Sequence, residues 1–121
     1  MPVACRVGPA GSPALSGAPM KIRLAEGSLV WRIHGGPDVE AEFFCNYELN
    51  RTWEPLLAAT GLRFSGRGED GEVRVLERAD HRFFLGTSYL PQLGSREGEP
   101  HPVIAAYVRA VAAFAARRSR S

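Results

Sequence analysis

The sequence is poor in cysteine and has no long apolar run. Only Cys5 and Cys45 occur among 121 residues, which gives neither a disulfide framework nor the ligand spacing of a zinc site. No stretch approaches the ~20 apolar residues of a membrane-spanning helix, and the N-terminus lacks the positive start and apolar segment of a secretory signal. We therefore expect a cytoplasmic protein with reduced thiols, no membrane partner, no metal and no cofactor.

Excess charge of one sign is also absent. The chain has 15 Lys and Arg residues against 13 Asp and Glu, a formal net charge of +2, which is too weak to indicate a nucleic-acid partner. Arginines near the C-terminus, Arg117, Arg118 and Arg120, favour the end of a helix, where the peptide dipole is negative. Nucleic-acid binding by this tail is a minor hypothesis that predicts steep salt dependence.

Composition divides the chain into three parts. Residues 1–20 hold a short strand, Val3–Val7, and a loop made almost entirely of glycine, alanine, serine and proline. Residues 21–116 have the mixed apolar and polar pattern of one folded domain. Residues 117–121 form the basic tail.

Two strands and a short helix are predicted at the start of this domain. Lys21–Leu24 and Val39–Tyr47 alternate between apolar and polar residues, as half-exposed strands do. Between them, Ser28 is a good N-cap for a short helix through Ile33, which a pair of glycines ends; a strand is the alternative for this segment. His34, beside the glycines, is predicted to be a surface residue rather than a metal ligand.

A helix and a hairpin follow. Asn50 is a favourable N-cap for a helix over Arg51–Ala59. The predicted buried stripe of this helix is Trp53, Leu56 and Leu57. Strands Leu62–Arg67 and Glu72–Arg78 flank an Asp-Gly turn, a strong hairpin signal. Alternating charged residues indicate cross-strand pairing on a solvated face of this hairpin: Arg63, Arg67, Glu72, Arg74, Glu77 and Arg78.

The segment Phe83–Tyr89 is predicted to be the central strand, because its residues are mostly apolar, small or aromatic. Pro91 cannot continue a central strand, so the strand ends at about Leu90. The last helix is predicted over Pro102–Ala116, with Pro102 at its first position. Apolar residues at helical spacing predict that this helix packs on the sheet: Val103, Ile104, Tyr107, Val108, Val111 and Phe114.

Several short motifs resemble one known family. They are, in chain order, Asn46-Tyr47-Glu48-Leu49-Asn50, the run Thr60–Gly66, the run Asp80–Phe84, the triplet Leu90-Pro91-Gln92, and His101-Pro102. Their order and spacing are similar to those of the class I glutamine amidotransferase domain of CTP synthases, over roughly residues 40–116. The resemblance implies an α/β fold, the C-terminal half of a flavodoxin-like sheet with packed helices.

In that family the central strand ends in His-Pro-Glu, whose histidine and glutamate serve a cysteine nucleophile. Leu90 and Gln92 stand at those two positions here, and neither side chain transfers a proton near neutral pH. No Gly-x-Cys-x-Gly nucleophile elbow occurs anywhere in the sequence. The resemblance therefore implies a chain without catalytic residues that corresponds to a C-terminal half-domain.

The predicted strand Val39–Tyr47 aligns with a run of alternating arginine and histidine that borders the family's glutamine site. This chain carries none of that positive charge, and a glutamine carboxylate would meet Glu42 instead of a guanidinium. By resemblance, the candidate ligand-binding residues are Phe44, Asn46 and Tyr89.

We therefore expect a CTP synthase-like amidotransferase homologue that has lost glutaminase catalysis and acts as a binding or assembly subunit. The alternative is a working subunit of a split or repurposed amidotransferase or ligase whose nucleophile half lies on another chain. The expected partner is a second copy or a second half-domain chain, with a small-molecule ligand as a further candidate. A trimmed piece of a longer protein would also account for the missing half.

Overall fold

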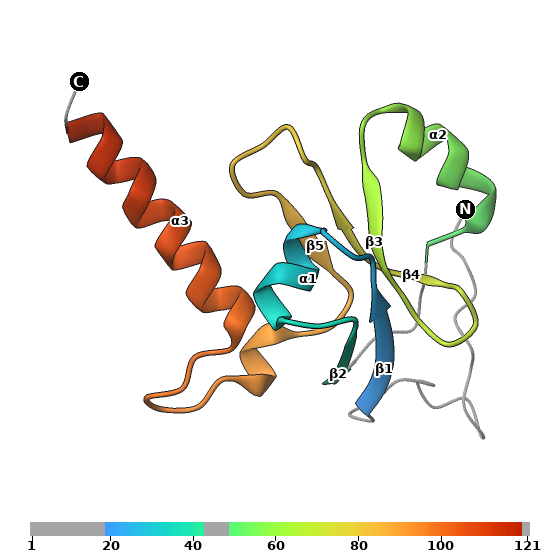
Figure 1. Ribbon diagram of the computed structural model, residues 1–121. Helices are drawn as coiled ribbons and strands as arrows, with labels where there is room; N and C mark the ends of the chain where they lie inside the picture. The colour runs from blue at the N-terminus through green and yellow to red at the C-terminus, as the bar shows by residue number, and fades with distance from the viewer. Residues whose placement is uncertain (1–18, 43–48, 120–121) are drawn as a thin grey trace.

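The fold is built on one antiparallel sheet, shown in the computed structural model of Figure 1, which describes residues 19–42 and 49–119. Within these ranges the sheet has five strands in the order β2-β1-β3-β4-β5. The strands are β1 (Pro19–Leu24), β2 (Asp38–Glu42), β3 (Arg63–Arg67), β4 (Val73–Glu77) and β5 (Leu85–Thr87). The helices are α1 (Leu29–His34), α2 (Glu54–Ala59) and α3 (Pro102–Ser119), with 3-10 turns η2 (Arg51–Trp53) and η3 (Pro91–Gly94).

The predicted strands of the first half are confirmed where the structure describes them. β1 contains the predicted segment Lys21–Leu24, and β3 and β4 form the predicted hairpin. β2 begins at Asp38 and pairs with β1 along its length. The rest of the predicted strand Val39–Tyr47, and the predicted strand Val3–Val7, lie outside the described residues.

The core lies on the face of the sheet that α1 covers. Its buried residues come from the strands, α1, the segment after β5 and the start of α3: Ile22, Leu24, Val30, Ala41, Val75, Tyr89 and Val103. Gly66 of β3 sits against this core, because a Cβ placed there would lie 2.6 Å from Cγ2 of Val75. Such a distance is shorter than atomic contact allows, so the close approach of β3 to β4 requires glycine at this position.

Helix α1 is capped at both ends as the sequence predicts. The Ser28 hydroxyl accepts a hydrogen bond from the Trp31 amide at 3.2 Å. Gly35 ends the helix in the left-handed region, with φ of 76°, a conformation that glycine adopts without strain. The helix alternative for this segment is therefore correct, and the strand alternative is wrong.

The sheet itself supplies a third cap. Glu77 lies two residues after Val75 on β4, so both side chains point to the same face of the sheet. Its carboxylate accepts hydrogen bonds from the amides of Leu29 (2.9 Å) and Val30 (3.3 Å). Glu77 is 4% exposed, and a buried carboxylate is tolerated only when such donors replace its water.

The predicted solvated charge ladder on the hairpin is wrong. Glu72, Arg74 and Glu77 are buried, and Arg74 lies 3.4 Å from the Glu72 carboxylate. The outer arginines pair away from the ladder, since Arg67 binds Glu54 of α2 at 3.1 Å and Arg78 binds Asp80 at 3.0 Å. The alternation of side chains along a strand identifies the two faces of the sheet, but it does not show which face other elements cover.

The predicted buried stripe of the second helix is also wrong. The segment Arg51–Ala59 forms η2 and then α2, with the Asn50 side chain capping Thr52 at 3.0 Å. Trp53 is 46% exposed and Leu56 59% exposed. Polar contacts to the β3–β4 hairpin anchor this segment instead, through Arg67 and Glu54 and through Arg51, which donates to the Asp70 carbonyl.

Phe83–Tyr89 was predicted to be the central strand, but it contributes an edge strand among those described. Only Leu85–Thr87 pairs, and it pairs with β4 alone. The two phenylalanines before it lie outside the ladder: the Phe83 ring packs edge-on against Tyr107 at 5.5 Å, and Phe84 is 40% exposed. The apolar composition of this segment reflects contacts with a helix rather than burial between two strands.

The last helix has the predicted start and runs three residues further than predicted, to Ser119. Its predicted packing on the sheet is wrong, because α3 contacts α1 and η3. Figure 1 shows its C-terminal half running away from the sheet. Of the predicted apolar stripe only Val103 is buried.

The cap from Glu77 generates the first prediction. Glu77→Ala leaves two amides without their acceptor beneath the helix, so the free energy of unfolding should fall by about 1–3 kcal/mol. Urea unfolding measures the change. The matched control Glu40→Ala, on the exposed face of β2, should change stability by no more than about 0.5 kcal/mol. Equal effects of the two substitutions would contradict the assignment.

Candidate functional site

The candidate site lies where β5 ends and η3 begins. The chain is fixed here by short hydrogen bonds: the Ser88 amide donates to the Arg74 carbonyl at 2.9 Å, and the Thr87 hydroxyl donates to the Tyr89 carbonyl at 2.9 Å. Leu90 precedes η3 in an extended conformation, and Pro91 occupies the first position of the turn. β5 ends at Thr87, three residues before Leu90. That Leu90 and Gln92 correspond to the family's catalytic histidine and glutamate stays a prediction.

These two positions carry no acid or base. Leu90 is half-buried and apolar, and Gln92 exposes a neutral amide. An amide donates and accepts hydrogen bonds, but it does not exchange a proton near neutral pH. Any proton transfer at this end of β5 would therefore need a group from another element.

The nearest titratable groups form a cluster beside η3: His34, Tyr89 and His101. His34 Nε2 lies 3.1 Å from the Tyr89 hydroxyl. The rings of His34 and His101 are 5.5 Å apart, edge to face. A Cβ placed on Gly94 would lie 2.8 Å from Cδ2 of His101, so η3 packs directly on this ring. The cluster joins the end of α1, the end of β5 and the start of α3.

Hydrogen bonds define the role of His101. Its Nδ1 accepts the Val103 amide at 3.1 Å, which caps the start of α3 and leaves the proton of the neutral ring on Nε2. The His101 amide donates to the Ser95 hydroxyl at 2.9 Å. His101 is therefore an N-cap whose acceptor nitrogen is already used.

Burial holds the cluster neutral near pH 7. It raises the pKa of the Tyr89 hydroxyl and lowers the pKa of His34, which the nearby His101 lowers further. Burial also lowers the pKa of His101. No sequence pattern indicates this cluster, because His34 lies 55 residues before Tyr89 and the three members belong to different elements. His34 was predicted to lie on the surface, but it is half-buried.

The candidate ligand-binding residues are placed only in part. Tyr89 is 1% exposed, and its hydroxyl contacts His34 rather than an open surface. Phe44 and Asn46 lie outside the described residues. The contact of these residues with a ligand stays a prediction.

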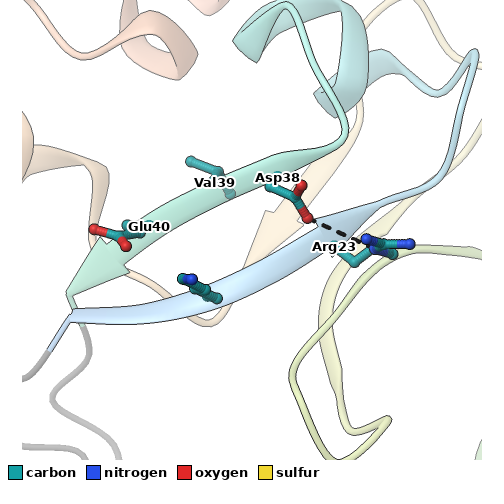
Figure 2. Close-up of a pocket in the computed structure, with 5 residues that line it drawn as sticks. Arg23, Asp38, Val39 and Glu40 are labelled. Carbon is teal, nitrogen blue, oxygen red and sulfur yellow. Dashed lines mark ion pairs between the residues drawn. The ribbon is translucent and has the colours of Figure 1, made fainter.

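A shallow depression of about 330 Å³ lies on the solvent face of β1 and β2 (Figure 2). Charged side chains of opposite sign line it, and the Arg23 and Asp38 side chains form an ion pair at 3.6 Å. Lys21 and Glu40 face each other in the register of the two strands. The charges balance, as on an ordinary exposed sheet face.

A second hollow, of about 300 Å³, lies over β4 and β5. Its lining includes Leu49, Arg74, Leu76, Gly86, Thr87 and Ser88. These residues offer hydrogen bonds and one guanidinium, but they include no nucleophilic thiol and no general base. The hollow is suited to binding rather than to covalent chemistry.

Two other features are absent from residues 19–42 and 49–119, a metal site and a membrane-spanning helix. No group of three or more His, Cys, Asp or Glu side chains there could hold a metal ion. None of the helices in these ranges combines the length and apolarity needed to cross a membrane.

Curated proteins with similar sequences are CTP synthases. The chain is 40% identical over 88 residues to the CTP synthase of Phenylobacterium zucineum, covering 72% of this chain and 16% of that protein. It is 35% identical over 98 residues to the CTP synthase of Syntrophus aciditrophicus, covering 80% of this chain and 18% of that protein. The chain thus spans less than a fifth of the length of these relatives. No protein-family model matches the sequence.

A solved structure shares the fold. The glutaminase domain of the Trypanosoma brucei CTP synthase, with bound acivicin, matches with a TM-score of 0.80 at 19% identity. The match covers 91% of this chain and 44% of that chain. More than half of that structure therefore has no counterpart here.

The shared fold shows that the chain has the α/β architecture of that glutaminase domain. Its sequence relatives specify the type, and the chain is a homologue of the glutamine amidotransferase domain of CTP synthases.

The histidine cluster generates the second prediction. Because both histidine pKa values are lowered in the fold, the unfolded chain takes up protons first as the pH falls. The contribution of the cluster to stability is complete above about pH 6.5 and is lost as the pH falls through the lower pKa values of the folded state. Protonation of His101 also removes the cap on the Val103 amide.

Urea unfolding at about pH 7.5 and about pH 5 tests this dependence. The double variant His34→Gln/His101→Asn should lose less stability between the two pH values than the parent chain. The control His81→Asn alters an exposed turn outside the cluster and should keep the parent's pH dependence. The assignment fails if the double variant keeps the full dependence.

Proposed function

We propose that this chain is an amidotransferase-type module that has lost glutamine hydrolysis and acts as a binding or assembly subunit. The observation that carries the proposal is the sequence Leu90-Pro91-Gln92 at the start of η3. Glutamine hydrolysis through a thioester needs a nucleophile, a base that activates it and a group that orients the base. Neither Leu90 nor Gln92 can act as base or orienting carboxylate.

The neighbouring histidines do not replace the missing base. His101 Nδ1 is the acceptor for the Val103 amide, and His34 Nε2 is engaged with the Tyr89 hydroxyl. Both rings hold structural elements together. A base must be free to take a proton from the nucleophile and give it to the leaving group.

The sequence also supports the loss of the nucleophile. A nucleophile elbow needs glycines close to the reactive residue, so that the backbone can turn sharply and expose it. Neither Cys5 nor Cys45 has a glycine two residues away. In this proposal the chain keeps the amidotransferase scaffold in a cytoplasmic setting and contributes surfaces to an assembly with a second copy or a second half-domain chain.

One observation favours the alternative of a split enzyme. The chain matches 44% of the solved glutaminase-domain chain, so a separate polypeptide with the remaining part could bring a cysteine and a new base. In that case glutamine hydrolysis would appear only when both chains are present. The two readings differ in whether any complex that contains this chain is active.

The third prediction tests the lost activity. The purified chain should release no ammonia from glutamine above the buffer rate, because it lacks a catalytic base and a nucleophile elbow. The double variant Leu90→His/Gln92→Glu restores the two side chains but not the elbow, so it should be equally inactive. Ammonia release is measured with a coupled assay at saturating glutamine.

Two results would overturn this proposal. One is turnover that disappears in Cys5→Ala or Cys45→Ala, because a nucleophile would then be present. The other is activity in the restored variant. Activity that is unchanged in all these variants would identify a contaminating glutaminase, which a second purification step must remove before the measurement counts.

A further inference from the structure

Four large apolar side chains of α3 are exposed: Tyr107 (54%), Val108 (58%), Val111 (49%) and Phe114 (43%). Their spacing of one, three and three residues places them along one side of the helix. We call these four residues the α3 stripe. A single exposed apolar residue is ordinary, but a row of four on one helix indicates a binding surface.

The α3 stripe is not the side by which the helix is anchored. Val103 is buried, and Ala106 and Ala110 are half-buried. These residues follow one another at spacings of three and four, so they form a line that runs directly beside the stripe. The elements that α3 contacts most are α1 and η3. Val103, with half-buried Ile104 and alanines, holds the start of the helix on the fold, while the four residues of the stripe stay exposed.

Two contacts hold the α3 stripe in place. The Phe83 ring packs edge-on against Tyr107 with centroids 5.5 Å apart. The Arg82 guanidinium lies 4.6 Å from the centre of the Phe114 ring. Side chains that are already ordered lose less conformational entropy when a partner binds.

The charged residues of α3 are all arginines. The sequence of α3 contains Arg109, Arg117 and Arg118 and no Asp or Glu. Arg82 adds a further positive charge beside Phe114. A complementary partner would present carboxylates around an apolar centre, since like charges brought together oppose association.

We propose that the α3 stripe binds a protein partner whose apolar face is bordered by aspartate and glutamate. This inference rests on the proposed assembly role and names the chemistry of the partner. Apolar contact supplies the attraction, and the arginines select for carboxylates on the other side.

A second copy of this chain fits the surface less well. An antiparallel pair of α3 helices would bring Arg117 and Arg118 to the start of the partner helix, where the peptide dipole is positive and the first turn has no acidic residue. A parallel pair would place arginine beside arginine. An anionic bilayer also fits less well, because apolar side chains must sink into it and Arg82 covers one side of Phe114.

Two synthetic helical peptides of about 20 residues test the proposal. Both carry leucines at helical spacing, flanked by glutamates in one and by lysines in the other. The full chain should bind the glutamate peptide at least about tenfold more tightly than the lysine peptide. Fluorescence anisotropy of labelled peptides measures both affinities.

Variants locate the binding surface. Val108→Ser/Val111→Ser should weaken binding of the glutamate peptide roughly tenfold or more. The control Ala112→Ser/Ala116→Ser adds the same two serines to α3 outside the stripe and should leave affinity unchanged. Far-UV circular dichroism checks that both variants keep the helix.

Charge reversal tests the selection for carboxylates. Arg117→Glu/Arg118→Glu should shift the preference toward the lysine peptide. The control Lys21→Glu/Arg23→Glu makes the same change in net charge on the exposed face of β1 and should not shift the preference.

The proposal is overturned if the chain binds the two peptides with equal affinity. It is overturned as well if Val108→Ser/Val111→Ser leaves the affinity for the glutamate peptide unchanged. It is also overturned if sedimentation shows a dimer that Val108→Ser/Val111→Ser dissociates, or if phosphatidylserine vesicles bind through the α3 stripe while neither peptide does. None of these results depends on ammonia release, so failure here is distinguishable from failure of the proposed loss of catalysis.

Discussion

The carboxylate of Glu77 connects the two layers of this fold. It projects from β4 and accepts the first amides of α1, which fixes the helix on the sheet above Val75. The placement of η3 and α3 depends on that position, because both meet α1 at the cluster of His34, Tyr89 and His101. The buried Glu77 carboxylate needs these hydrogen bonds from α1. Other placements of the helix, which would break them, are therefore disfavoured.

Local signals in the sequence predicted local structure well. Ser28 and the glycine pair fixed the ends of α1, and the Asp-Gly turn identified the hairpin. Pro102 marked the start of α3. These features act through backbone geometry and hydrogen bonds within a few residues, so no knowledge of the rest of the fold is needed.

Signals that depend on which face is covered were misread. Glu72, Arg74 and Glu77 were predicted to belong to a solvated ladder, but all three are buried, and the start of α1 covers Glu77. Trp53 and the α3 stripe have the spacing of buried residues, yet the described chain leaves them exposed.

The cluster of His34, Tyr89 and His101 could not be predicted from the sequence, because three separate elements bring it together. The positions of Leu90 and Gln92 at the end of β5 were predicted through the family resemblance, since neither residue has chemistry of its own to reveal a site.

The structure separates the scaffold of an amidotransferase domain from its chemistry. The fold matches a glutaminase domain over 91% of this chain. The atoms that surround the end of β5 serve to hold helices in place, through caps and neutral hydrogen bonds. Under the proposed loss of catalysis, the scaffold still presents surfaces, and the α3 stripe is the one that the side-chain geometry makes most distinct.

The central claim is that this module forms no thioester with glutamine. The most direct test is the intact mass of the chain after incubation with an electrophilic glutamine analogue, with and without excess glutamine. A catalytic cysteine would form one adduct, and glutamine would protect it because both compete for one site. The account predicts no adduct that glutamine prevents. A stoichiometric adduct that glutamine abolishes would contradict it.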